Sequence, residues 1–235
     1  MNIKSEIKEF FLFFLYPLEA KQEIGKKKLH YLLNRKAWLM LIVFLLIAII
    51  SEPLTMIFRT EFFTKFLNIN LNEIANSKET LSIGILIPPL LEETLYRLGI
   101  TKNLVLYTLG SLIFSVLCVL IIGFYGYITI LFPLVGLYFF CLKKFNLSAF
   151  YQITNKHKHI LNFGFLLYII FTIIIFALSH RGLYNAKNYN ILIGLSATSH
   201  QVIGGLLLSY LRFKNGLIFA IILHTLVNLK LIYFK

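Results

Sequence analysis

The chain has 235 residues, of which 58% are hydrophobic and only 14% are charged, and its mean hydropathy is +0.79. An ordinary soluble domain is about 45–50% apolar and about 25% charged, so this composition lacks the polar surface that a water-soluble globule needs. The formal net charge is +13. The lysines and arginines lie between long apolar runs and not along one amphipathic face, which is typical of a membrane protein and argues against nucleic acid as a partner.

All ten acidic residues are glutamates, and the chain contains no aspartate. This absence excludes mechanisms that need an aspartate, among them aspartyl intramembrane proteolysis and the Ser-His-Asp triad. The two cysteines, Cys118 and Cys141, lie inside apolar runs. We therefore expect them to pack in the protein and not to form a disulfide.

In chain order, residues 1–36 are predicted to form a cytoplasmic and interfacial segment, and residues 37–235 a transmembrane helical bundle. Phe10–Tyr16 is apolar but too short to cross a bilayer, and its aromatic residues and flanking lysines predict an interfacial helix. A span needs about 20 mostly apolar residues. Seven stretches qualify: Ala37–Phe58, Leu81–Ile100, Leu104–Ile122, Tyr127–Leu142, Ile160–Leu178, Ile191–Leu211 and Leu217–Phe234. The expected fold is an all-α polytopic membrane protein with about seven transmembrane helices, in the range of six to eight.

Lysine and arginine are unevenly distributed between alternate loops. With the N-terminus in the cytoplasm, 15 of them lie inside and 7 outside, and the remaining one, Arg97, lies within a span. Cytoplasmic loops carry such an excess, so we expect a cytoplasmic N-terminus. The 18 lysines against 5 arginines favour a bacterial source, and hence an integral protein of the bacterial inner membrane.

The second expected span carries three charged residues, Glu92, Glu93 and Arg97. A charge at the centre of a span costs about 2.5–3.5 kcal/mol even on lenient insertion scales. Glu93 and Arg97 are four residues apart, so they can form an ion pair on one helix face. Glu92 faces Tyr96 instead, which leaves its carboxylate available as a general base. The alternative is that the pair only neutralises itself and Glu92 faces a wet cavity.

Two further spans carry polar groups. The fifth ends in Phe176–His180, and the seventh contains His224 and Asn228, which are four residues apart and share a helix face. An imidazole and a carboxamide on one face can donate hydrogen bonds to one point, as an oxyanion site requires. The alternatives are interhelical hydrogen bonds for this pair and an interfacial position for His180.

A metal site is a further alternative, because one glutamate and two histidines are ligands of the kind that zinc takes. The sequence has no His-Glu-x-x-His helix and no Gly-x-Ser-x-Gly nucleophile turn. Attack by a water molecule that a glutamate activates is the remaining chemistry.

Three motifs in this order resemble those of the CPBP family, the CAAX proteases and bacteriocin-processing proteins that are also called the abortive-infection family. They are Glu-Glu-x-x-x-Arg (Glu92–Arg97), Phe-x-x-x-His (Phe176–His180) and His-x-x-x-Asn (His224–Asn228). The run Gly204–Gly216 before the last motif also resembles the family. The resemblance covers about residues 85–230.

The resemblance implies an intramembrane glutamic endopeptidase that needs no metal and no other cofactor. The implied site residues are Glu92, Glu93, Arg97, His180, His224 and Asn228. Glu92 and His180 would activate the water, His224 and Asn228 would hold the oxyanion, and Glu93 with Arg97 would brace the site. The implied partners are the lipid bilayer and a peptide or protein substrate, which can be tethered to the membrane. Alternatives are a non-enzymatic bacteriocin-immunity or peptide-binding protein of the same family, and a transporter, which is disfavoured because no inverted repeat is visible.

Two expected spans lie between the first and second motifs. An even number of spans preserves the direction of the later helices, so the three motifs can still meet. Glu92 would lie near the inner end of its span and His180 at the outer end of its own. Either the acidic helix begins at Pro88–Pro89, where two prolines favour a kink or a helix start, or the fifth span is shifted.

Overall fold

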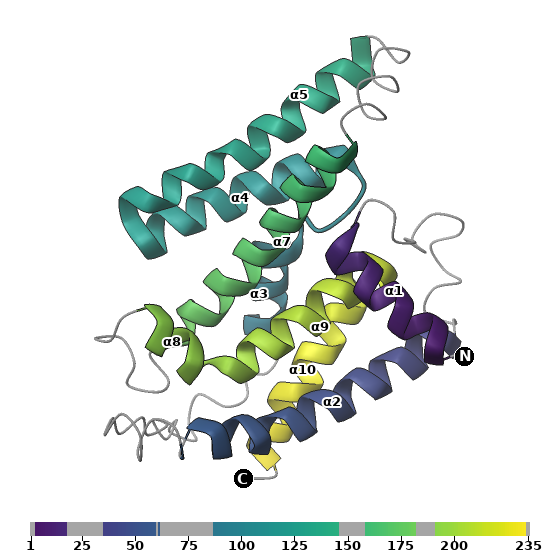
Figure 1. Cartoon of the computed structure of the whole chain (residues 1–235), viewed down its shortest axis with the longest axis vertical. Coiled ribbons are helices and arrows are strands. Elements are labelled where there is room, and N and C mark those ends of the chain that lie inside the picture. The colour runs from purple at the N-terminus through teal and green to yellow at the C-terminus, as the bar shows by residue number, and fades with distance from the viewer. Residues whose placement is uncertain are drawn as a thin grey trace.

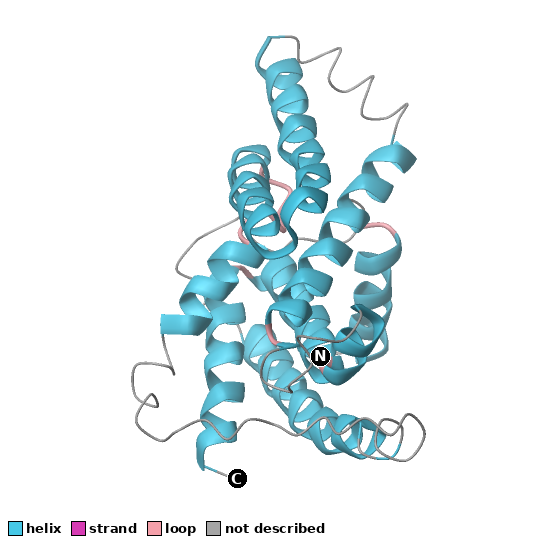
Figure 2. Ribbon diagram, turned by 90° about the vertical axis from the view of Figure 1, so that its left-hand side faces the viewer, coloured by secondary structure: helices cyan, strands magenta, loops and turns pink. Residues whose placement is uncertain are grey.

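The computed structural model describes residues 3–17, 35–59, 61, 87–145, 158–181 and 191–233. Within these ranges the regular secondary structure is entirely helical (Figures 1 and 2). The elements are α1 (Ile3–Leu15), α2 (Arg35–Arg59), α3 (Ile87–Arg97), α4 (Leu104–Ile122), a 3-10 segment η3 (Gly123–Ile130), α5 (Leu131–Phe145), α7 (Lys158–Ser179), α8 (Ile191–Ala197), α9 (Ser199–Asn215) and α10 (Leu217–Tyr233). The expected all-α class is confirmed for this part of the chain.

Two helical segments are long and apolar enough to cross a membrane, Ala37–Phe58 in α2 and Leu161–Ser179 in α7. The pair α8 and α9 passes the same test together and makes a third if it forms one span. Along one face of α2, Ile42, Leu46 and Ile50 are exposed, as expected of a helix that faces lipid. Two to three helices of the described chain could therefore cross a membrane.

The remaining expected spans are interrupted or have apolar parts that are too short to pass the same test. α3 has 11 residues, and residues 81–86 of that expected span lie outside the described part of the chain. Residues 127–130 of the fourth stretch belong to the 3-10 segment η3, which precedes α5. The apolar parts of α4, of η3 with α5, and of α10 are shorter than 18 residues.

The sixth expected span is broken, and this corrects the prediction of one continuous helix. α8 and α9 meet at an angle of 74°. The hydroxyl of Thr198 at the break donates to the carbonyl oxygen of Gly194 at 2.9 Å. The hydroxyl of Ser196 likewise donates to the carbonyl oxygen of Leu192 at 2.9 Å. The backbone of Thr198 has φ −100° and ψ 27°, outside the helical range, so the helix is interrupted there, a local effect that hydropathy does not register.

The ends of α4 coincide with the prediction because local signals mark both of them. The side chain of Asn103 accepts hydrogen bonds from the backbone nitrogens of Val105 and Leu106 at 3.0 and 3.3 Å, which caps the first turn. Gly123 ends the helix with a φ of 62°, a backbone conformation that glycine adopts without strain. α4, η3 and α5 then form a hairpin at one end of the molecule (Figure 1).

The core that holds the polar motifs consists of α3, α7, α9 and α10, with α2 packed against α9 and α10 (Figure 1). α1 lies on the C-terminal half of α9. The rings of Phe10 and Phe13 pack on Tyr210 with centroid separations of 5.1 and 5.5 Å, and the ammonium group of Lys214 pairs with the carboxylate of Glu6. The N-terminal helix expected at Phe10–Tyr16 is therefore present, begins earlier, and is attached to the core.

Candidate active site

The acidic helix α3 enters the core with one buried face. Pro89, Glu93, Tyr96 and Arg97 are buried, and the spacing of three to four residues between the first three places them on one side of the helix. Glu92 lies beside this face with its side chain 25% exposed. The two prolines occupy the first turn of α3, where a missing N–H donor is tolerated. The residues before Ile87 lie outside the described part of the chain, so the alternatives of a kink and a helix start at the prolines both stand.

Glu93 joins two other motif residues through one oxygen atom. Nη1 of Arg97 donates to Oε1 of Glu93 at 2.6 Å, and Nδ1 of His224 lies 2.9 Å from the same oxygen. Glu93 and Arg97 are 0% and 1% exposed. The predicted ion pair between Glu93 and Arg97 is confirmed. The contact of Glu93 with His224 on α10 was not predicted. Because an ionised carboxylate only accepts hydrogen bonds, Nδ1 of His224 carries the proton in this contact.

His180 is oriented by the last turn of α7. Its Nδ1 lies 2.8 Å from the carbonyl oxygen of Phe176 and 3.2 Å from Oγ of Ser179. A carbonyl oxygen can only accept, so Nδ1 of His180 is the donor and the hydrogen-bond pattern assigns the tautomer. Its other ring nitrogen, Nε2, faces α3.

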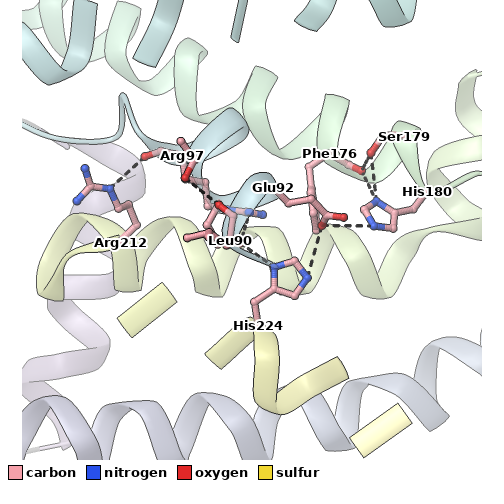
Figure 3. A network of polar contacts seen from close by, with 10 residues as sticks. Leu90, Glu92, Arg97, Phe176, Ser179, His180, Arg212 and His224 are labelled. Carbon is pink, nitrogen blue, oxygen red and sulfur yellow. Dashed lines mark hydrogen bonds and ion pairs between the residues drawn. The ribbon is translucent and has the colours of Figure 1, made fainter. Parts of the chain in front are cut away.

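Glu92 lies between the two imidazoles, as Figure 3 shows. Its Oε2 is 3.7 Å from Nε2 of His180 and 3.6 Å from Nε2 of His224. Both separations exceed a direct hydrogen bond, and this buried oxygen has no hydrogen-bond partner among the described residues. When both imidazoles are neutral and carry their proton on Nδ1, three acceptor atoms lie close together: Oε2 of Glu92 and Nε2 of each histidine. This arrangement favours the binding of a molecule with hydrogen-bond donors, such as water.

Phe176 forms the common surface under this group. The guanidinium carbon of Arg97 lies 4.3 Å from the centroid of its ring, a distance at which a cation is attracted to the ring face. The rings of His180 and His224 lie at centroid separations of 4.7 and 5.9 Å from it. The sequence motif included Phe176 without a role for its side chain, because a phenylalanine in an apolar helix carries no signal that distinguishes it from its neighbours.

Gly205 on α9 is a second residue whose place in the site was not predicted. A Cβ atom at this position would lie 3.1 Å from Cγ2 of Ile173 and 3.6 Å from Nη2 of Arg97. The glycine therefore allows the backbone of α9 to approach the ion pair closely. Its signal in the sequence is its position in the glycine pair before the last motif.

Five of the six predicted site residues meet in one cluster, namely Glu92, Glu93, Arg97, His180 and His224. The sixth, Asn228, lies one helical turn beyond His224 on α10 and is partly buried. The polar contacts that the structure gives for the cluster do not extend to Asn228. Within the described ranges, no group of three or more His, Cys or Glu side chains is arranged to hold a metal ion.

No family model, curated protein or solved structure matches the chain significantly.

Proposed function

We propose that the protein is a membrane-embedded peptide hydrolase of the CPBP type, in which Glu92 and His180 activate a water molecule without a metal. The observation that carries the proposal is the position of Oε2 of Glu92, 3.7 and 3.6 Å from one nitrogen of each of two imidazoles. Separations of this size suit a bridging water. A water molecule has two O–H donors, which Oε2 of Glu92 and Nε2 of His180 can receive.

The reaction starts with transfer of a proton from this water to Glu92, while the oxygen attacks the carbonyl carbon of the peptide bond. The ring of His180, held through Nδ1 by the carbonyl oxygen of Phe176, orients the water through Nε2. A C–O bond forms and the carbonyl oxygen becomes an oxyanion. When the C–N bond breaks, the proton on Glu92 passes to the leaving amine. General acid–base catalysis of this kind contributes about 10²–10⁴-fold in rate.

His224 and Asn228 are the proposed oxyanion donors. Nδ1 of His224 already donates to Glu93, so Nε2 can donate to an oxyanion only after the ring has taken up a proton from solvent and become an imidazolium ion, a proton that returns to solvent after product release. The buried carboxylate of Glu93 lies 2.9 Å from Nδ1 and holds the ring in place, and Arg97 holds that carboxylate from the next turn of α3. Asn228 contributes its carboxamide N–H once a substrate occupies the site. Donors aimed at a developing oxyanion are each worth about 10²–10³-fold in kcat.

The proposed setting is a bacterial inner membrane, crossed about seven times with the N-terminus in the cytoplasm. Support comes from the apolar helices of the described chain and from the lysine and arginine excess on one side. The proposed substrate is a peptide or membrane-tethered protein whose scissile bond reaches α3.

The experiment compares wild type with Glu92→Gln in liposomes, using an internally quenched peptide library and mass spectrometry of the products. Glu52→Gln on α2 is the matched control, because it makes the same substitution in another apolar helix. We expect Glu92→Gln to lower cleavage about 100-fold or more, with an unchanged circular dichroism spectrum and full cleavage by Glu52→Gln. Equal cleavage by Glu92→Gln and wild type would contradict the proposal. Peptide binding without cleavage by the wild type would favour the non-enzymatic peptide-binding alternative.

A further inference from the structure

Arg212, near the C-terminal end of α9, reaches across to the end of the acidic helix. Its Nε donates to the carbonyl oxygen of Arg97 at 3.2 Å, and its Nη2 donates to the carbonyl oxygen of Leu98 at 3.0 Å. The residue is 5% exposed. Figure 3 shows it on the side of Arg97 that lies away from His180.

Arg212 supplies hydrogen-bond donors to carbonyl oxygens at the C-terminal end of α3. The last carbonyl groups of an α-helix have no partner within the helix, and a cation there interacts favourably with the negative end of the helix dipole. α3 ends at Arg97, so Arg212 caps its C-terminus from another helix.

The same turn is also held by α4. A Cβ atom at Gly110 would lie 2.1 Å from the backbone nitrogen of Gly99, so the two backbones are in direct contact there. The end of α3 is therefore fixed between this glycine contact and the guanidinium of Arg212. Two constraints on one turn determine how far α3 is rotated about its own axis.

That rotation decides where the carboxylates point. Arg97 offers its backbone oxygen to Arg212 and its guanidinium to Glu93, and Glu93 in turn holds His224. We propose that Arg212 is a positioning residue of the site, which acts through Arg97 to keep Glu92 and Glu93 aligned with the two imidazoles. The kinetic part of this proposal rests on the proposed hydrolytic function, whereas the structural part does not.

Lys214 provides a matched control on the same helix. It is 4% exposed, pairs with Glu6 of α1 and donates to the hydroxyl of Tyr210 at 3.2 Å. Arg212→Met and Lys214→Met therefore each remove one buried cation from the end of α9, but only the first removes a contact with α3. If Arg212 serves stability alone, the two variants should lose activity in proportion to stability.

The experiment measures kcat and KM in liposomes with a cleaved member of the peptide library, together with nuclear magnetic resonance of ¹⁵N-labelled histidine. We expect Arg212→Met to lower kcat about 100-fold with little change in KM, since a misplacement of about 1 Å can cost that much. Arg212→Lys should restore part of kcat. The ¹⁵N resonance of His224, assigned by its loss in His224→Asn, should shift in Arg212→Met and stay in place in Lys214→Met.

Unchanged kcat and an unchanged His224 resonance in Arg212→Met would overturn the proposal, as would equal effects of the two methionine variants. If the wild type cleaves no peptide, the proposed function fails and the His224 resonance alone decides the role of Arg212. If Arg212→Met does not fold, Arg212→Lys replaces it, because one ammonium group cannot reproduce the two-pronged contact. An unshifted His224 resonance and wild-type kcat in Arg212→Lys would then overturn the proposal.

Discussion

Nδ1 of His224 lies 2.9 Å from Oε1 of Glu93, although 131 positions separate the two residues in the sequence. The same carboxylate oxygen accepts a hydrogen bond from Arg97. This one atom connects α3 to α10 and so ties the third motif to the first. Glu92, one residue earlier, faces the remaining nitrogen of the His224 ring. Adjacent glutamates therefore contact opposite nitrogens of one imidazole.

The two nitrogens of His224 can be tested separately. In His224→Asn the side-chain amide nitrogen replaces Nδ1 and keeps the bond to Glu93, so the protein should unfold as the wild type does but lose activity. In His224→Gln the amide nitrogen replaces Nε2, and the lost bond to a charged group should cost about 1.5–3 kcal/mol of unfolding free energy. Denaturant titration and the cleavage assay measure the two effects. Equal stability of both variants would contradict the assigned contacts.

The ion pair of Glu93 and Arg97 should show strong coupling. Arg97→Met leaves the carboxylate of Glu93 buried without its cation, and we expect a loss of about 3–5 kcal/mol in unfolding free energy. The double variant Glu93→Gln with Arg97→Met should recover part of that loss, because no unpaired charge remains. Lys8→Met, at an exposed position on α1, is the control and should change stability by about 0.5 kcal/mol at most. Additive losses in the double variant would refute the coupling.

Phe176 should matter to activity more than its burial alone predicts. Phe176→Leu removes the cation–π contact with Arg97, which is worth about 2 kcal/mol where the cation is desolvated. It also removes the ring against which His180 and His224 pack. Phe165→Leu is the matched control on α7, since Phe165 is buried against Tyr107 and Phe213 and not against the site. We expect comparable losses of stability but a much larger loss of cleavage in Phe176→Leu. Parallel losses of cleavage in the two variants would count against the role of Phe176.

The crossing of α3 and α4 should not tolerate a side chain at Gly110. Gly110→Ala would place a Cβ atom 2.1 Å from the backbone nitrogen of Gly99, so the helices must separate and both stability and cleavage should fall. Gly164→Ala on α7 is the control, because its Cβ would meet nothing within 4 Å. Alanine there should raise stability by about 0.5–1 kcal/mol. Thermal unfolding compares the two variants, and an unperturbed Gly110→Ala would show that the helices do not meet as described.

Chelators should leave cleavage unchanged. In the proposed mechanism a carboxylate and an imidazole activate the water, so removal of divalent ions has no step to affect. The measurement is cleavage in liposomes before and after dialysis against EDTA and 1,10-phenanthroline. Loss of cleavage that added zinc restores would exclude the metal-free mechanism.

Features that depend only on neighbouring residues could be predicted from the amino-acid sequence. The helical class, the ends of α4 and the Glu93–Arg97 pair were all predictable. Each of them follows from the geometry of one helix or from a cap, because residues four apart in a helix share a face whatever surrounds them. The order of the three motifs also indicated which polar residues belong together.

Tertiary structure alone decided which atoms meet. The contact of His224 with Glu93, the ring of Phe176 under Arg97, and the reach of Arg212 to the end of α3 each join separate helices. Such contacts depend on the rotation and depth of each helix. Those are set by close-packed side chains throughout the core and by glycines that let backbones approach. Hydropathy reports only that a helix is apolar, and so it predicted the helices but not the arrangement of the site.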